Sequence, residues 1–159
     1  MTRGNGQELL IATRAKKNDP LRQGELVLPG GGLRVYETFA QAAVREVYEE
    51  TGVRTIFSPT LDFTPRKRSI RVPELTGGVD EHGAIYLAYT DSKREYCGRL
   101  VRLSPIGRQE PREQERSDAK NPRYVSFREA FCSKREFTPA CQALLEIIED
   151  ELRINPYAL

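Results

Sequence analysis

Cysteine and histidine are scarce in this sequence, and their scarcity excludes several kinds of site. The three cysteines, Cys97, Cys132 and Cys141, are odd in number and none belongs to a CxxC pair. We therefore expect free, buried thiols in a reducing cytosol, and neither a zinc site nor a disulfide framework. A cysteine nucleophile is the alternative, and it would depend on the single histidine, His82, as its base.

Long hydrophobic runs are missing as well. The residues that follow Met1 are polar as far as Glu8, without the apolar core of a signal peptide. No stretch approaches the roughly 20 apolar residues that a membrane-spanning helix requires. We therefore expect a cytoplasmic protein with no membrane partner. The net charge of +2 gives no overall reason to expect a nucleic-acid partner either.

The length of 159 residues fits a single domain, residues 1–159, which can bury a core without covalent staples. The order of the predicted elements indicates an α/β fold, with a mixed β-sheet between α-helices. The arginine-rich segments are expected to be polar connections and lie at residues 66–71 and 108–121. Strands are predicted at residues 8–13, 26–28, 53–58, 84–90, 99–103 and 123–127, and helices at residues 38–51 and from Pro139 onward.

The predicted helix at residues 38–51 carries three glutamates on one face. Glu46, Glu49 and Glu50 are spaced i, i+3 and i+4, which brings their carboxylates together. Clustered carboxylate oxygens suit a hard divalent cation such as Mg²⁺. Glycines 30–32 precede the helix and allow the backbone to approach a ligand closely. The alternative interpretation is an ordinary solvated acidic face, which is what charged runs usually form.

The full pattern around these glutamates is more specific than the glutamates alone. It fits G-x5-E-x7-R-E-U-x-E-E-x-G-U, where U is an aliphatic residue, at every fixed position. With average residue usage, a chance match at one start position is on the order of 10⁻⁹. This pattern resembles the signature of the Nudix hydrolase family. The fixed positions are Gly31, Glu37, Arg45, Glu46, Val47, Glu49, Glu50, Gly52 and Val53.

Two segments outside the signature also resemble this family, although less specifically. The sequence LLIATR, a loop and LVLPGGG are similar to the strand, loop and strand that lead into the signature. The sequence RYVSFREA at residues 123–130 is similar to the family's late strand and the short helix after it. The resemblance therefore implies the Nudix fold for most of the chain.

The resemblance implies a metal site for Mg²⁺, with Mn²⁺ as an alternative, and assigns its ligands. Glu46 and Glu50 would be the principal ligands. The backbone carbonyl of Gly30 or Gly31 would complete the coordination. Glu49 would be a third ligand or would act on the attacking water.

The resemblance also assigns roles to residues around the metal. Arg45 would orient Glu49 through a charge-assisted hydrogen bond. Glu37 would contact a further metal or brace the loop. A general base in this family comes from a late loop, and we take Glu115 as the candidate. The other carboxylates of that loop region are Glu110 and Glu113.

The activity implied is hydrolysis of a phosphoanhydride bond in a small nucleoside diphosphate derivative. The length of the chain and its long late loop favour ADP-ribose or a nucleotide sugar as the substrate. The alternatives are a nucleoside triphosphate or RNA-end pyrophosphohydrolase, and a non-catalytic Nudix module that senses a nucleotide. Residues 62–71 contain Phe63 and four basic side chains, and would either hold a base and phosphates or form an exposed hairpin.

One departure from the family concerns the strand that usually precedes residues 8–13. Here the preceding segment, residues 1–7, is MTRGNGQ, which is too polar and glycine-rich for a core strand. We therefore expect an exposed sheet edge, which invites pairing with a second chain. A homodimer is our hypothesis.

Overall fold

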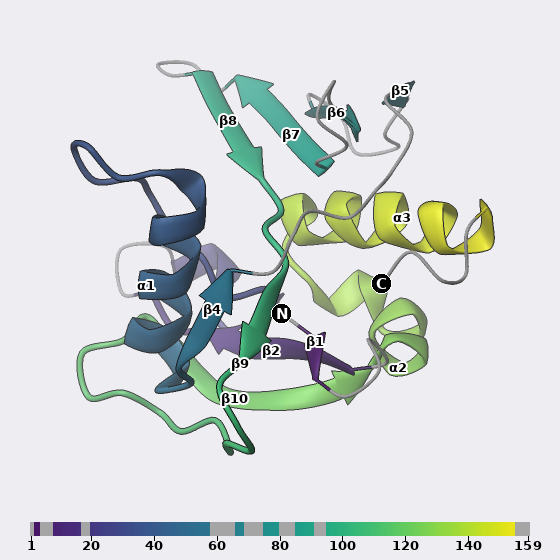
Figure 1. Ribbon diagram of the computed structural model, residues 1–159. Coiled ribbons are helices and arrows are strands. Elements are labelled where there is room, and N and C mark those ends of the chain that lie inside the picture. The colour runs from purple at the N-terminus through teal and green to yellow at the C-terminus, as the bar shows by residue number, and fades with distance from the viewer. Residues whose placement is uncertain are drawn as a thin grey trace.

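The structure is a computed structural model that describes residues 2–3, 8–16, 20–57, 66–68, 75–79, 85–90 and 95–154. These residues form the α/β fold expected from the sequence (Figure 1). Every described strand pair is antiparallel, and a parallel bridge joins Leu26 to Phe137. The helices are α1 (Phe39–Thr51), α2 (Phe127–Cys132) and α3 (Pro139–Ile154), with 3-10 turns at Pro20–Arg22 and Lys134–Glu136.

The described strands form three sheets. The first contains β1 (Thr2–Arg3), β2 (Glu8–Arg14), β3 (Leu26–Val27) and β10 (Ala119–Ser126). The second pairs β4 (Thr55–Phe57) with β9 (Leu103–Pro105). The third has the order β5 (Arg66–Arg68), β6 (Leu75–Val79), β7 (Ile85–Thr90) and β8 (Glu95–Arg99).

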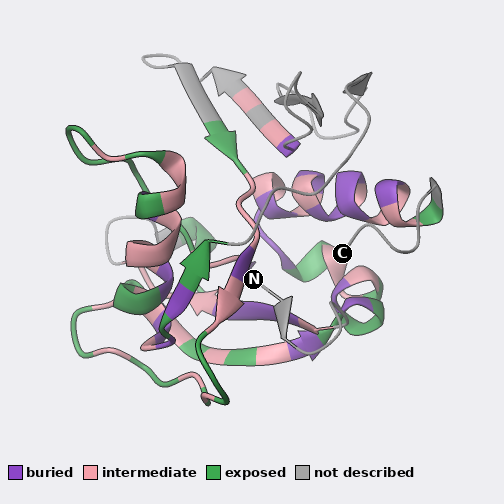
Figure 2. Cartoon of the chain, viewed as in Figure 1, coloured by how far each residue is buried: buried purple, intermediate pink, exposed green. Residues whose placement is uncertain are grey.

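Strand β2 separates two hydrophobic cores. Alternate side chains of a strand point to opposite faces. Leu9 and Ile11 belong to the core that contains residues of α2 and α3, whereas Leu10 packs with Val47 of α1 and with Leu103. Figure 1 shows α1 on one side of β2 and β10 and the other two helices on the opposite side, and Figure 2 shows the buried stretch of β2 between them. The sheet therefore lies between helices, as predicted.

Local sequence signals fix both ends of α1. The Thr38 hydroxyl accepts a hydrogen bond from the backbone N–H of Gln41, and the Gln41 side chain accepts one from the backbone N–H of Thr38. This capping box satisfies two donors at the start of the helix. Gly52 ends the helix with φ 70°, a left-handed conformation that glycine adopts without steric cost. These caps hold the helix that carries the signature glutamates.

Several strand predictions need correction. Residues 2–3 do form a strand, β1, which pairs with the start of β2, so the edge of β2 is partly covered there. Arg66–Arg68 is strand β5 rather than a connection, because its backbone pairs with β6 irrespective of its side chains. The predicted strand at 99–103 is instead a crossing between β8 and β9. Leu100 of that crossing packs against the first core and Val101 against the second.

The C-terminal helix and the late strand agree with the predictions. β10 includes residues 123–126, and α2 follows it directly. Helix α3 begins at Pro139 after Thr138, whose backbone N–H donates to the carbonyl of Leu26. Within the described part of the chain, no helix has both the length and the apolar composition needed to span a membrane.

Candidate active site

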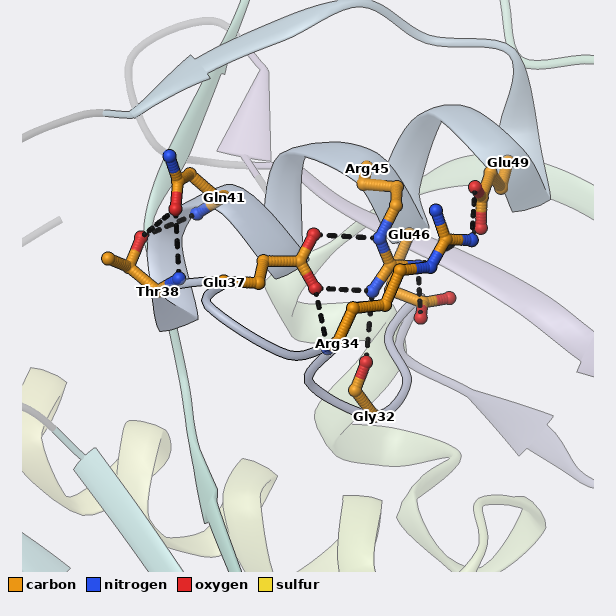
Figure 3. A network of polar contacts seen from close by, with 8 residues as sticks. All are labelled: Gly32, Arg34, Glu37, Thr38, Gln41, Arg45, Glu46 and Glu49. Carbon is orange, nitrogen blue, oxygen red and sulfur yellow. Dashed lines mark hydrogen bonds and ion pairs between the residues drawn. The ribbon is translucent and has the colours of Figure 1, made fainter.

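The guanidinium group of Arg45 is the centre of the signature segment, and all five of its N–H donors have acceptors (Figure 3). Nε and Nη2 each donate to Glu37, both at 2.8 Å. Nη1 donates to Glu46 at 2.6 Å and to Glu49 at 3.0 Å. Nη2 also donates to the carbonyl of Gly32 at 2.9 Å. Arg45 therefore ties α1 to the loop before it, and its contact with Glu49 is the one the resemblance implied.

Glu37 is fully engaged in bracing this loop. Besides the two bonds from Arg45, its carboxylate accepts a hydrogen bond from the backbone N–H of Arg34 at 2.9 Å. The hydrogen bonds from Arg45, followed by that from Arg34, lower the pKa of Glu37 to about 2. Among the described contacts, those of Glu37 fit the bracing alternative better than a role as a metal ligand.

Glu46 lies directly against the backbone of Gly31. A Cβ atom added at Gly31 would lie closer than 3.0 Å to both carboxylate oxygens of Glu46 and to its Cδ. The lack of a side chain at Gly31 therefore leaves the room that the Glu46 carboxylate occupies. At Gly32 and Gly30, by contrast, an added Cβ would meet nothing within 4 Å.

Glu50 is the least neutralised carboxylate of the helix. Its Oε2 accepts a hydrogen bond from the backbone N–H of Gly30 at 3.1 Å. Burial, together with the negative charges of Glu46 and Asp118, nevertheless raises the pKa of Glu50 to about 7. The group of Gly30 that contacts Glu50 is the N–H, and not the carbonyl expected as a metal ligand.

Glu49 is bonded to two arginines, one of which the signature does not include. Its Oε2 accepts from Arg45, and its Oε1 accepts from Nη2 of Arg34 at 2.9 Å. Arg34 occupies one of the five unspecified positions between Gly31 and Glu37, so the pattern gives no signal for it. Its contact with Glu49 forms only when the loop folds back over the helix.

The chemistry of these carboxylates fits a divalent cation. Glu46, Glu49 and Glu50 offer only oxygen donors, and Glu50 lies against the loop before the helix, where the backbone N–H of Gly30 donates to it. Among the described residues, no group of three or more acidic, histidine or cysteine side chains converges on one point as a metal site requires. Glu46 and Glu49 are turned toward Arg45, so a bound cation would require at least Glu49 to reorient.

Comparison with known proteins decides the family. Residues 1–142 match the family model described as NUDIX domain. The chain belongs to the Nudix family. It is therefore a hydrolase of phosphorus-containing acid anhydrides. The solution structure of the E. coli ORF135 protein is similar, with a TM-score of 0.61 and 20% sequence identity over 98% of this chain and 87% of that chain. At this identity the likeness supports the fold alone.

The late loop of this Nudix domain offers a second set of carboxylates. Glu115 lies exposed in a turn, and Glu110 is exposed as well. Glu113 is tied to its own loop, because it accepts from the backbone N–H of Asn121 at 3.0 Å and pairs with Lys120. Asp118, which the sequence reasoning missed, is the loop carboxylate whose charge acts on Glu50. Its neighbour Ala119 pairs with Arg14 of β2, a long-range contact without a local signal.

A pocket of about 490 Å³ adjoins the C-terminal end of α1. None of the four signature glutamates lines it, so it is separate from the candidate metal site. Its lining consists of Tyr48, Thr51, Gly52, Arg108, Gln109, Glu110, Arg112 and Gln114.

Other predicted features lie away from this site or outside the described residues. Cys141 is buried as expected, and burial raises the pKa of its thiol, which disfavours a nucleophilic thiolate. Cys132 is exposed, which corrects the expectation that the thiols are buried, because it falls on the open side of the short helix α2. His82 and the side chains of Phe63 and Cys97 lie outside the described residues.

Proposed function

We propose that this Nudix hydrolase is a Mg²⁺-dependent pyrophosphohydrolase acting on a nucleoside diphosphate derivative, with ADP-ribose or a nucleotide sugar as the favoured substrate. The observation that carries the proposal is the placement of Glu46, Glu49 and Glu50 on α1, with Glu46 against the backbone of Gly31 and Glu50 hydrogen-bonded to the N–H of Gly30. The preference for the substrate rests on the long loop between β9 and β10, residues 106–118, which offers room for contacts beyond the diphosphate.

Glu46 and Glu50 would be the principal residues that hold the cation, and Glu49 would join them as a third ligand or act on the attacking water. When bound, the cation neutralises negative charge on the phosphate oxygens, and Mn²⁺ is an alternative to Mg²⁺. The carbonyls of Gly30 and Gly31 remain candidates for further ligands. Glu37 and Arg45 would hold the loop against the start of the helix.

The remaining chemistry belongs to a carboxylate base. As the oxygen of water bonds to one phosphorus, a carboxylate accepts a proton from that water, and the bridging P–O bond breaks. The electron pair of that bond leaves with the second phosphate, which departs as a phosphate monoester. Glu49 and Glu115 are the proposed bases, and Asp118 joins them because its charge acts on Glu50.

Two rival functions differ in what they require. A nucleotide-sensing module would bind nucleotide without cleaving it, and a pyrophosphohydrolase for nucleoside triphosphates or RNA ends would prefer those substrates. The three glutamates favour catalysis over sensing, since ligand binding alone does not require a set of metal-ligating carboxylates. Binding to RNA that weakens steeply with salt would favour the RNA-end alternative.

The proposal is tested by incubating the protein with Mg²⁺ and a panel of phosphoanhydrides, followed by identification of the products. The panel contains ADP-ribose, a nucleotide sugar, a dinucleotide polyphosphate, a nucleoside triphosphate and capped RNA. We expect a nucleoside monophosphate and a phosphorylated remainder, formed fastest from the first two substrates. Binding of nucleotide without cleavage of any member would instead support the sensor.

The same assay compares the candidate bases. Glu115→Gln, Asp118→Asn and Glu113→Gln change one loop carboxylate each, and Glu113 serves as the control because its loop contacts already engage it. Loss of a general base typically lowers kcat by about 10²- to 10⁴-fold. The homodimer also stays a prediction, which sedimentation at micromolar concentration would check.

A further inference from the structure

We propose that Arg34 is a phosphate-binding residue. Its side chain pairs with Glu49 in the absence of a cation and moves to a phosphate of the substrate when a cation binds at the glutamates. This inference rests on the proposed function. It adds a residue that the signature does not specify, and its chemical target is a phosphate group of the bound nucleotide.

The first observation is that only the side chain of Arg34 is free to move. Its carbonyl accepts a hydrogen bond from the N–H of Glu37 at 3.0 Å, and its own N–H donates to the Glu37 carboxylate at 2.9 Å. Glu37 is itself fixed by two hydrogen bonds from Arg45. The backbone of Arg34 is thus anchored at the edge of the site, and its guanidinium can turn without movement of the loop.

The second observation is the contrast between the two arginines on Glu49. The side chain of Arg45 is 15% exposed and all its donors have acceptors, whereas that of Arg34 is 63% exposed. Among the described residues, Glu49 is the one acceptor for the Arg34 side chain, through Nη2. Exposed ion pairs of this kind stabilise a protein little. Most of the Arg34 donors are therefore left for a ligand.

The third observation is that Arg34 and a cation compete for the same carboxylate. The guanidinium lies 2.9 Å from Oε1 of Glu49, so a cation bound to this carboxylate would lie close to the guanidinium, and the two positive charges would repel each other. Binding of a divalent cation at Glu49 therefore weakens the contact with Arg34. A substrate phosphate close to the cation offers the released guanidinium a new anionic partner, which it can bind with two parallel hydrogen bonds.

Two equilibrium measurements test this exchange without relying on turnover. Removal of the competing charge in Arg34→Gln is expected to tighten binding of Mn²⁺ alone, measured by electron paramagnetic resonance in the absence of nucleotide. The same variant is expected to bind α,β-methylene ADP, measured by calorimetry with Mg²⁺ present, about 10- to 100-fold more weakly, as loss of charge-assisted hydrogen bonds implies. A purely structural role would not move these two affinities in opposite directions.

Two further variants sharpen the comparison. Arg34→Lys keeps the charge but loses the paired donors, so we expect nucleotide affinity between those of the wild type and Arg34→Gln. Arg128→Gln removes an exposed arginine on α2 and is expected to leave both affinities unchanged. Unchanged Mn²⁺ and nucleotide affinities in Arg34→Gln would overturn the inference. Failure of the wild type to cleave any phosphoanhydride would overturn the proposed function instead, and the Mn²⁺ measurement would still report on the exchange.

Discussion

Arg45 and Glu37 face each other across the start of the signature helix through two parallel hydrogen bonds, Nε to Oε1 and Nη2 to Oε2, both 2.8 Å long. Their side chains are only 15% and 13% exposed, so the pair is largely shielded from water. Removing one side of the pair leaves the other, partly buried charge without its partner, which destabilises the loop. Arg45 also contacts Glu46 and Glu49, so one guanidinium positions three carboxylates.

Arg45→Lys should therefore damage both stability and activity. Lysine keeps the charge but cannot supply the paired donors that Glu37 receives. We expect the urea midpoint of unfolding to fall and kcat to fall at least about 100-fold. Arg128→Lys on the exposed side of α2 is the matched control and should change stability by less than about 0.5 kcal/mol. Equal changes in stability and kcat in the two variants would show that the Arg45 contacts matter no more than those of an exposed arginine.

Two adjacent glycines provide a test of the position of Glu46. A Cβ at residue 31 would overlap the Glu46 carboxylate, whereas a Cβ at residue 32 meets nothing within 4 Å. Gly31→Ala is expected to displace Glu46, to weaken Mg²⁺ binding and to lower kcat about 10- to 100-fold. Gly32→Ala should remain close to the wild type in calorimetric Mg²⁺ titration and in rate. Unchanged Mg²⁺ binding and kcat in Gly31→Ala would mean that the position of Glu46 is not needed for catalysis.

The raised pKa of Glu50 predicts how a cation stabilises the protein at different pH. The pKa is about 7 in the folded state against 4.5 ordinarily, so the folded state holds a proton that the unfolded chain loses in that window. Without a cation, this group therefore lowers the free energy of unfolding as the pH rises from 4.5 to 7, by on the order of 3 kcal/mol. A cation that binds the ionised carboxylate removes this cost.

We accordingly expect Mg²⁺ to raise Tm more at about pH 8 than at about pH 5, as measured by calorimetry. Glu50→Gln removes the titrating group and should show little difference between the two pH values. A cation effect of equal size at both pH values in the wild type would contradict the assignment of Glu50 as a ligand.

Gly52 and Gly107 both have φ 70°, and their comparison separates strain from packing. An alanine at either position pays for a left-handed backbone, about 1–2 kcal/mol. At Gly52 the new Cβ would also lie 2.6 Å from Nε2 of Gln114, which donates at 3.0 Å to the carbonyl of Arg112. Gly52→Ala should therefore be more destabilising than Gly107→Ala by about 1 kcal/mol in urea unfolding, since Gln114 must give up that bond. A smaller loss for Gly52→Ala would reverse this order.

The parts of the fold with local signals could be predicted from the sequence. Thr38 and Gly52 mark the ends of α1, and Thr138 with Pro139 marks the start of α3, because caps depend on neighbouring residues alone. The signature likewise identified Arg45 and the glutamates that surround it, since their spacing on one helix sets which side chains meet.

The parts that depend on long-range contacts could not be predicted in this way. The composition of Arg66–Arg68 is typical of a polar loop, and the segment becomes a strand because its backbone pairs with β6. Arg34 reaches Glu49 across 15 residues, and Asp118 acts on Glu50 from a distant loop. Neither contact follows a fixed spacing, so both emerge only when the loops fold against α1.

The most direct test of the account is the initial rate of ADP-ribose hydrolysis as a function of Mg²⁺ concentration, compared between the wild type and Glu50→Gln. We predict a saturable dependence on Mg²⁺ in the wild type and a rate lower by at least about 100-fold in the variant, because the substitution removes a ligand of the cation. Circular dichroism would confirm that the variant is folded. Cleavage that proceeds equally without Mg²⁺, or equally in folded Glu50→Gln, would contradict the account.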